Sequence, residues 1–180
     1  MLAPMVAQDV DGQYRGMDKA IHQAEDGFVN YTVFSLWDTF RALHPLMTII
    51  DEERTNARMR SLLRKYEEGG ALPKWPLASN YTIIVYPVAA VLADAWSKGI
   101  TDFDTVLAVE AAVFSSQYHP EALRKLPEPR KEGVMPIHLK YIDEQAWIPE
   151  DQVRGSVSYG LECAYYEWCI ALMAKRIGKT

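Results

Sequence analysis

Cysteine is scarce in this chain of 180 residues, which contains only Cys163 and Cys169. The two lie six positions apart in a segment whose pattern predicts a helix, so about 9 Å of helix axis separates them and they point to different faces. A disulfide cannot span that separation within a straight helix. We therefore expect two buried free thiols, because free cysteine is among the most often buried residue types.

Long hydrophobic runs and an excess of positive charge are lacking too. No apolar run approaches the roughly 20 residues of a membrane-spanning helix, so no membrane segment is expected. The first residues do not place a basic region before an apolar one, as a signal peptide would. The formal net charge is −5, and this acidic balance argues against a nucleic-acid partner, because binding to phosphates requires a basic excess.

Sequence motifs for bound metals and nucleotides are missing as well. The four histidines are scattered, none pairs with a cysteine at the spacing of metal ligands, and the chain has no P-loop and no GxGxxG pattern. The motifs by themselves therefore predict no metal site in this chain.

What the sequence does contain is a series of helical patterns. Its 49% apolar and 24% charged residues are typical of a globular domain with a core of its own. No segment shows convincing β alternation, so the predicted fold class is all-α, built of helical hairpins. Helices are predicted over about residues 32–44, 51–70, 83–98, 101–117 and 156–179, and the proline-rich stretch 119–154 is predicted to be a loop with a short turn near 140–146.

Proline, glycine and acidic residues mark the expected helix ends. Pro45 is expected to end or kink the first helix, and Gly69 with Gly70 to close the second. An aspartate, Asp102 or Asp104, is expected to cap the fourth helix. The last helix carries four large apolar residues on one stripe, namely Leu161, Tyr165, Trp168 and Leu172.

The stretch LWDTFRALHP contains the first candidate site. On the predicted helix, Trp37, Arg41 and His44 share a face, with Asp38 alongside. A sugar ring is held by an aromatic platform and by a carboxylate that accepts hydroxyl protons, and Trp37 and Asp38 supply both, with Arg41 fixing the carboxylate. The alternative is a core tryptophan beside a surface ion pair between Asp38 and Arg41, three residues apart. The residues alone leave both interpretations open.

The loop GGALPKWPLAS is the second candidate. Two prolines bracket Trp75 and would hold it rigidly enough to present it to a ligand. A tryptophan that fills a space in the hydrophobic core explains the same pattern, so both interpretations of Trp75 stay open.

Five collinear segments resemble glycoside hydrolase family 92, from about residue 9 to residue 178. They are DVDGQYRGMD, NYTVFSLWDTFRALHPL, EEGGALPKWPLASN, LADAWSKGI and SVSYGLECAYYEWCIALMAKRIGK. The resemblance implies a calcium-dependent exo-α-mannosidase that acts with inversion on α-1,2 and related linkages, in a periplasmic or secreted protein. It also implies an (α/α)6 toroid and assigns sugar contacts to Trp37 and Asp38, and with the residue patterns above the candidate substrate-binding residues are Trp37, Asp38, Arg41 and Trp75.

The resemblance also limits what this chain is expected to do. The family's general acid, general base and most calcium-linked residues belong to motifs similar to EGNAWQY, GNEPxH and GNDDxGxMSAW, which do not occur here. No catalytic residue and no calcium ligand is therefore assigned to the chain. The family pattern similar to ETxxMIGYH is replaced by YTIIVYP, and the AYDDW pattern by the run from Tyr165 to Trp168, so any sugar contacts of those positions are not carried over.

Residues 1–180 are accordingly expected to form a single, incomplete segment of a helical catalytic domain. Five helices are too few to close a ring of twelve, so an apolar helix face should remain uncovered, and we expect either a truncated piece of a longer product or a chain that self-associates through that face. Three alternatives follow: part of an α-mannosidase with a mannose-containing glycan as substrate, a non-catalytic helical module that binds a glycan or a partner, or a structural segment with no activity.

Overall fold

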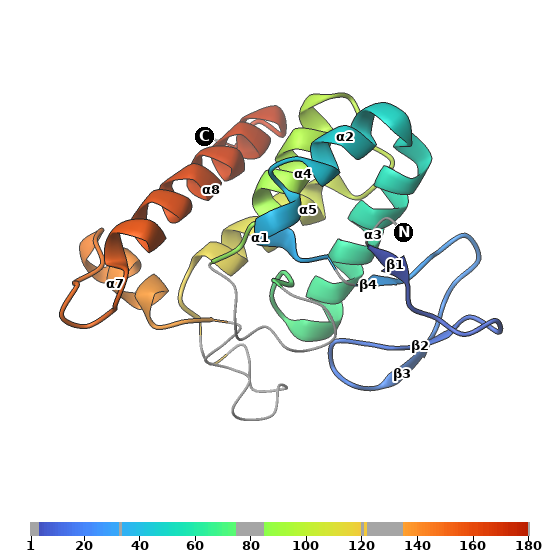
Figure 1. The fold of residues 1–180 in the computed structure, drawn as a ribbon, viewed down its shortest axis with the longest axis horizontal. Helices are drawn as coiled ribbons and strands as arrows, with labels where there is room; N and C mark the ends of the chain where they lie inside the picture. The colour runs from blue at the N-terminus through green and yellow to red at the C-terminus, as the bar shows by residue number, and fades with distance from the viewer. Residues whose placement is uncertain (1–3, 33, 75–84, 120, 122–134, 180) are drawn as a thin grey trace.

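The computed structural model describes residues 4–32, 34–74, 85–119, 121 and 135–179. Within these ranges the protein is a layered assembly of helices with short strands at its N-terminal side (Figure 1). This confirms the predicted all-α, hairpin-built class. The elements, in order, are β1 (Met5–Val6), β2 (Gln13–Arg15), β3 (Ile21–Gln23), β4 (Tyr31–Thr32), α1 (Leu36–Thr39), α2 (Leu43–Ile50), α3 (Glu52–Gly69), α4 (Val88–Ser97), α5 (Thr105–Ser116), α7 (His138–Gln145) and α8 (Ser156–Arg176).

The N-terminal segment forms two small antiparallel pairs, β1 with β4 and β2 with β3. The sequence shows no β period here because each strand is only two or three residues long. The β2–β3 hairpin is held against α3 by Glu68, whose carboxylate accepts hydrogen bonds from the Tyr14 hydroxyl at 2.8 Å and from the Met17 backbone N–H at 3.0 Å.

The first predicted helix is wrong in its extent. The chain forms α1 over four residues, turns at residues 40–42, and begins α2 at Leu43. Pro45 lies in the first turn of α2 rather than ending a helix, a position where its missing N–H costs nothing. Trp37 and His44 consequently belong to different helices, and the predicted common face does not form.

Two other predicted helix ends are confirmed. Gly70 ends α3 with φ 76°, which favours glycine; at the start of α3, Asp51, which the sequence had not marked as a cap, accepts a hydrogen bond from the Arg54 backbone N–H at 3.0 Å. At the start of α5, the Asp104 carboxylate accepts from the Leu107 N–H at 2.8 Å, so Asp104 rather than Asp102 is the cap.

The core lies between α3, α4, α5 and α8. α4 is buried nearly all round, as its almost wholly apolar sequence predicts, and it begins directly after Pro87. α8 runs along the side of the helical layer and packs on α4 and α5 (Figure 1). Cys163 and Cys169 lie on its buried face as free thiols, which confirms that prediction.

The stretch predicted as a loop is partly helical. α7 covers His138–Gln145, close to the predicted turn at 140–146. Among the described residues, no helix combines the length and hydrophobicity needed to cross a membrane.

Candidate functional site

A groove of about 450 Å³ lies between the end of α1 and the N-terminal half of α8. It joins two of the segments singled out in the sequence, which are more than 100 residues apart. α1 and the turn after it contribute three large side chains, and α8 contributes the opposite wall. The lining residues are Trp37, Phe40, Arg41, Ser158, Leu161, Glu162 and Tyr165.

Arg41 is fixed at the centre of this groove. Its guanidinium carbon lies 4.8 Å from the Trp37 ring centroid and 4.6 Å from that of Phe40, both within the range of cation–π attraction. Its Nη2 also forms an ion pair with Glu162 Oε1 at 3.0 Å. The flat cation is therefore oriented by two rings and a carboxylate, and its other N–H groups remain as donors toward the groove.

Glu162 connects this cation to the core. While Oε1 binds Arg41, Oε2 accepts a hydrogen bond from the Tyr166 hydroxyl at 2.6 Å. Burial and the Glu162 carboxylate raise the pKa of Tyr166 far above its usual value, so the hydroxyl stays a donor. With both oxygens engaged, Glu162 is a positioning group and is poorly suited to accept a substrate proton.

Asp38 does not have the predicted partner. Its carboxylate accepts a hydrogen bond from the Ser35 hydroxyl, and among the described residues Arg41 pairs with Glu162 rather than with Asp38. The reason is the turn at residues 40–42, which breaks the helical geometry that an i, i+3 pair requires. Asp38 is left exposed at the end of α1, able to accept further hydrogen bonds.

Trp37 is half-buried, and its indole Nε1–H is buried without a hydrogen-bond partner in the described part of the chain. A buried donor without a partner is unusual, because leaving it unpaired costs about 1–3 kcal/mol. Trp37 is thus neither an ordinary core tryptophan nor a fully solvated one.

The remaining predicted residues lie elsewhere. His44 is buried behind the site, where its ring stacks on Phe34 at a centroid distance of 6.3 Å. Burial, together with the nearby Arg58 charge, lowers its pKa to about 3, so it is neutral. Trp75 falls outside the described residues.

A buried polar cluster next to Trp75 in sequence was not foreseen. Lys74 is buried, and burial lowers its pKa to about 7, opposed by the nearby Cys163. Burial raises the pKa of Cys163 to about 12, and next to it Tyr86 donates to Glu167 Oε1 at 2.6 Å. Its members lie on α8, on the loop at Lys74 and on the segment just before α4, so no local pattern in the sequence could have signalled the cluster.

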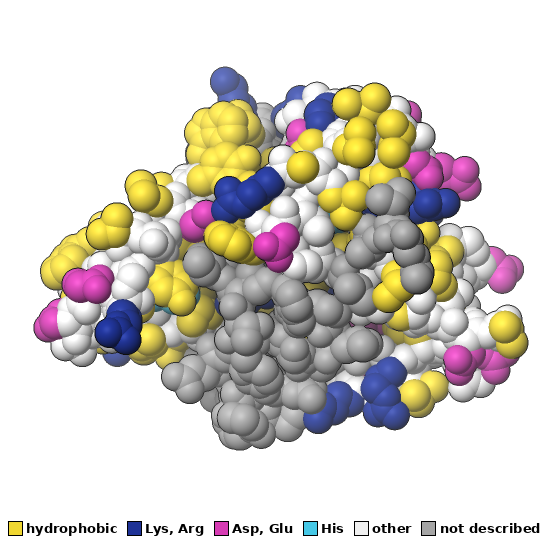
Figure 2. Space-filling view, in the orientation of Figure 1, with side chains coloured by type: hydrophobic (Ala, Val, Ile, Leu, Met, Phe, Trp, Pro, Cys, Tyr) yellow, Lys and Arg dark blue, Asp and Glu magenta, His cyan; other side chains and the backbone are white. Residues whose placement is uncertain are grey.

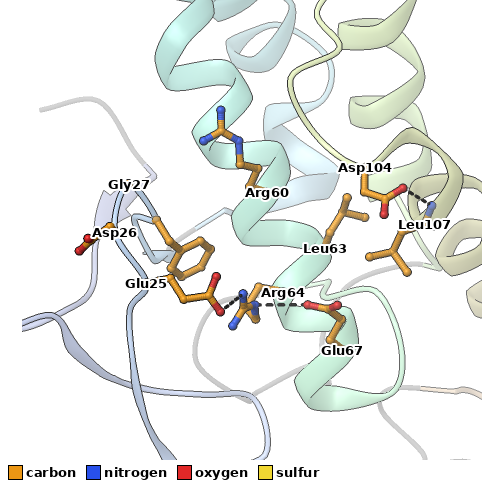
Figure 3. Close-up of a pocket in the computed structure, with 10 residues that line it drawn as sticks. Glu25, Asp26, Gly27, Arg60, Leu63, Arg64, Glu67, Asp104 and Leu107 are labelled. Carbon is orange, nitrogen blue, oxygen red and sulfur yellow. Dashed lines mark hydrogen bonds and ion pairs between the residues drawn. The ribbon is translucent and has the colours of Figure 1, made fainter.

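A second hollow, of about 340 Å³, lies between the loop at residues 25–28, α3 and the start of α5 (Figure 3). Its arginines are already paired. Arg64 binds Glu25 at 3.1 Å and Glu67 at 3.3 Å and lies 5.0 Å from the Phe28 centroid, and Arg60 binds the Asp102 carboxylate and backbone carbonyl. The Arg64 contacts hold the N-terminal segment on α3, and the Arg60 contacts hold the loop before α5 on the same helix, so we assign the hollow a structural role.

Residues 1–180 match the family described as the glycosyl hydrolase family 92 catalytic domain. The chain is similar to the family GH92 alpha-mannosidase BT3965 from Bacteroides thetaiotaomicron, solved in complex with mannoimidazole, with 38% identity and a TM-score of 0.82 over 99% of this chain and 22% of that one. It is also similar to the family GH92 inverting mannosidase BT2199 from Bacteroides thetaiotaomicron VPI-5482, with 30% identity and a TM-score of 0.74 over 93% of this chain and 21% of that one. A comparison with curated proteins gives no match.

The likeness extends through the whole chain but through only part of each relative. The chain spans about a fifth of the length of these solved mannosidases. It includes the groove between α1 and α8 and the buried cluster around Lys74. By its match over residues 1–180, the chain belongs to glycosyl hydrolase family 92, a family of α-mannosidases whose catalytic domain is an (α/α)6 barrel.

Proposed function

We propose that this chain supplies the sugar-holding part of an α-mannosidase that removes terminal α-linked mannose, of the α-1,2 type, with inversion. The observation that carries the proposal is the groove at Trp37 and Arg41. It occurs in a chain that matches, along its whole length, a mannosidase solved with mannoimidazole and an inverting mannosidase.

Each side chain has a role that follows from its chemistry. Trp37 offers a flat apolar surface to the C–H face of the pyranose ring. Asp38 accepts hydrogen bonds from two sugar hydroxyls, and Arg41, held by Glu162, donates to the oxygens of the same ring. Trp75 is proposed as a further platform on the loop after Lys74.

The groups that transfer protons are proposed to lie in other parts of the family's catalytic domain. Inversion requires a general acid and a general base that hold a water between them, about 6.5–9.5 Å apart. Among the described residues, Glu162 is the only carboxylate that lines the groove, and its oxygens already bind Arg41 and Tyr166. Asp38, beside the groove, is suited to hold hydroxyls. This chain therefore binds the sugar and does not cut it.

Calcium is implied by the family resemblance, but the described residues do not fit a site for it. Among them, no three or more histidine, cysteine or acidic side chains converge in a way that could hold a metal ion. Ca²⁺ requires six to eight oxygen ligands. We propose that its ligands lie outside this chain and derive no step through the metal.

A non-catalytic glycan-binding module is the second candidate, favoured by the engagement of both Glu162 oxygens. Two measurements on the same protein test what both candidates require, namely binding of the sugar without cleavage. Incubation with α-1,2-mannobiose in calcium buffer is expected to release no mannose, whereas calorimetry is expected to detect binding. Release of mannose would refute our assignment of catalysis outside the chain.

Substitutions locate the binding. Asp38→Ala is expected to abolish it, because the hydroxyl acceptor is lost, while Asp26→Ala, which removes an equally exposed aspartate in the other hollow, should leave it unchanged. Absence of any binding by the unmodified chain would leave a structural segment without a sugar site and would overturn the proposal.

A further inference from the structure

Three polar side chains are buried where β4, α2 and α3 meet, and most of their polar atoms lack hydrogen-bond partners. Arg58 on α3 is 1% exposed, His44 on α2 is 2% exposed and Thr32 on β4 is 7% exposed. We call these three residues the Arg58 cluster. Within the part of the chain that the structure describes, no partner exists for Arg58 Nε and Nη1, for either ring nitrogen of His44 or for the Thr32 hydroxyl. Buried polar groups are nearly always paired, so a concentration of unpaired ones requires an explanation.

The packing of the three elements brings the Arg58 cluster together. α3 packs against both α2 and β4. The Arg58 guanidinium carbon lies 5.8 Å from the ring centroid of Tyr31, the residue directly before Thr32. Phe34, two residues after Thr32, stacks on the His44 ring at a centroid distance of 6.3 Å. Burial lowers the pKa of His44 to about 3, and the charge of Arg58 is close enough to add to this effect.

The positive charge of the Arg58 cluster is not neutralised within the described part of the chain. Asp51 attracts the guanidinium, but its carboxylate already binds the Arg54 side chain at 3.3 Å and the Arg54 backbone N–H at 3.0 Å. Figure 2 shows Lys and Arg side chains that stand out from one face of the molecule, where water solvates them. Arg58 has no such access to water, and a buried charge is costly unless it is paired.

We propose that the Arg58 cluster binds a small monovalent anion of the halide class, with chloride as the ligand. The Arg58 Nε–H and Nη1–H groups, the Thr32 hydroxyl and one N–H of the neutral His44 ring are all hydrogen-bond donors. A halide accepts hydrogen bonds from every direction and supplies the one negative charge that balances the guanidinium. The inference does not depend on the proposed sugar site.

The enclosure of the Arg58 cluster selects a small ion over other partners. With its members so deeply buried, no opening admits a carboxylate side chain from elsewhere in a longer protein or from a partner protein. Sulfate and phosphate bring a second negative charge that one guanidinium does not neutralise. Buried waters are the alternative, since they also pair with donors, but they leave the charge of Arg58 without a counter-charge.

The binding of chloride is expected to be weak. Both ions lose their hydration, which offsets most of the attraction between them, so the expected Kd is in the millimolar range. Chloride therefore recovers only part of what burying the guanidinium costs. An apolar side chain at position 58 remains the more stable choice.

Thermal unfolding at matched ionic strength tests the proposal, with sodium chloride compared against sodium gluconate, whose anion is too large for the cluster. At a chloride concentration ten times Kd, the ratio of folded to unfolded protein should rise about tenfold. For a chain of this size, that change raises Tm by about 3–6 °C.

Three variants locate the effect. Arg58→Met should have the same Tm in both salts, because the charge that holds the anion is gone. Arg60→Met is the matched control: it removes a surface arginine of the same helix and should keep the full chloride effect. Thr32→Val loses only the hydroxyl and should show a smaller increase in Tm.

The line width of the ³⁵Cl NMR signal is a second, direct measurement, because chloride that exchanges with a protein site gives a broader line than free chloride. The unmodified chain and Arg60→Met should both broaden the line, and Arg58→Met should not.

Equal Tm values of the unmodified chain in chloride and gluconate would overturn the proposal and favour buried waters as the partners of the cluster. A chloride effect that persists in Arg58→Met would also overturn it, since that would be a general effect of the salt, and so would equal line broadening by Arg58→Met and Arg60→Met. If Arg58→Met does not fold, an undiminished chloride effect in Thr32→Val would refute the site.

Discussion

Arg58→Met is expected to stabilise the fold, because Arg58 lies in the core as a charge that forms no ion pair with any other described residue. The side chain is only 1% exposed, and its Nε and Nη1 atoms have no hydrogen-bond partner in the described part of the chain. Burial lowers its pKa, and Asp51 attracts the charge only partly, since its carboxylate already binds Arg54. Replacing buried ionic groups with apolar residues of similar size is often stabilising by about 1–4 kcal/mol.

The attraction of Arg58 to the Tyr31 ring works against this gain. The guanidinium carbon lies 5.8 Å from the ring centroid, at the outer limit of a cation–π contact, which is worth about 0.5–1 kcal/mol at that strength. Methionine fills most of the same volume and brings no unsatisfied donors. The net expectation is an increase of about 1–3 kcal/mol in the free energy of unfolding, or a rise in Tm of about 3–10 °C for a domain of this size.

Urea unfolding followed by circular dichroism measures this change, with calorimetry for Tm. Arg60→Met is the control, since Arg60 binds Asp102 at the surface and its loss should cost at most about 1 kcal/mol. If Arg58→Met instead lowers the free energy of unfolding by 2 kcal/mol or more, Arg58 has a strong partner and our account of the core is refuted.

Three further outcomes are expected. Arg41→Met should weaken mannoside binding about tenfold or more. It should change the free energy of unfolding by less than about 1 kcal/mol, because the ion pair of Arg41 with Glu162 is half-exposed. If calorimetry gives the variant and the unmodified chain the same affinity for the mannoside, the role of Arg41 is contradicted. Stability should fall as the pH is lowered from about 6.5 toward 3, since the buried His44 and His138 keep pKa values of about 3 while the unfolded chain takes up protons. In urea titrations, His44→Phe should make the free energy of unfolding depend less steeply on pH. An unchanged slope would contradict the assignment of His44 as a buried neutral histidine. Gly70→Ala should cost about 1 kcal/mol in the same assay because of the positive φ at that position, and a neutral result would show that the end of α3 relaxes.

Local signals in the sequence were sufficient for the parts of the fold that depend on local physics. Gly70 marks the end of α3 and Asp104 the start of α5, because helix ends need a left-handed residue and a side-chain acceptor. Likewise, the spacing of Cys163 and Cys169 was enough to exclude a disulfide between them.

The break between α1 and α2 could not be read locally, because a proline is equally acceptable at the end of one helix or in the first turn of the next. The ion pair between Arg41 and Glu162 could not be predicted from the sequence for a different reason. Glu162 lies 121 residues away, and only the packing of α8 beside α1 brings it there. A stripe pattern also cannot show whether a helix face is covered, so the exposure of Trp168 required the structure.

The indole N–H signals of the five tryptophans test the central claim most directly. We expect ¹⁵N NMR during titration with mannoimidazole to shift the resonance of Trp37, whose buried Nε1–H has no partner among the described residues, together with that of Trp75. Trp96, in the core, and Trp168, outside the groove, should not move. In Asp38→Ala the Trp37 shift should disappear. A Trp37 resonance that stays in place at saturating ligand, or that shifts equally in Asp38→Ala, would contradict a mannose site at this groove.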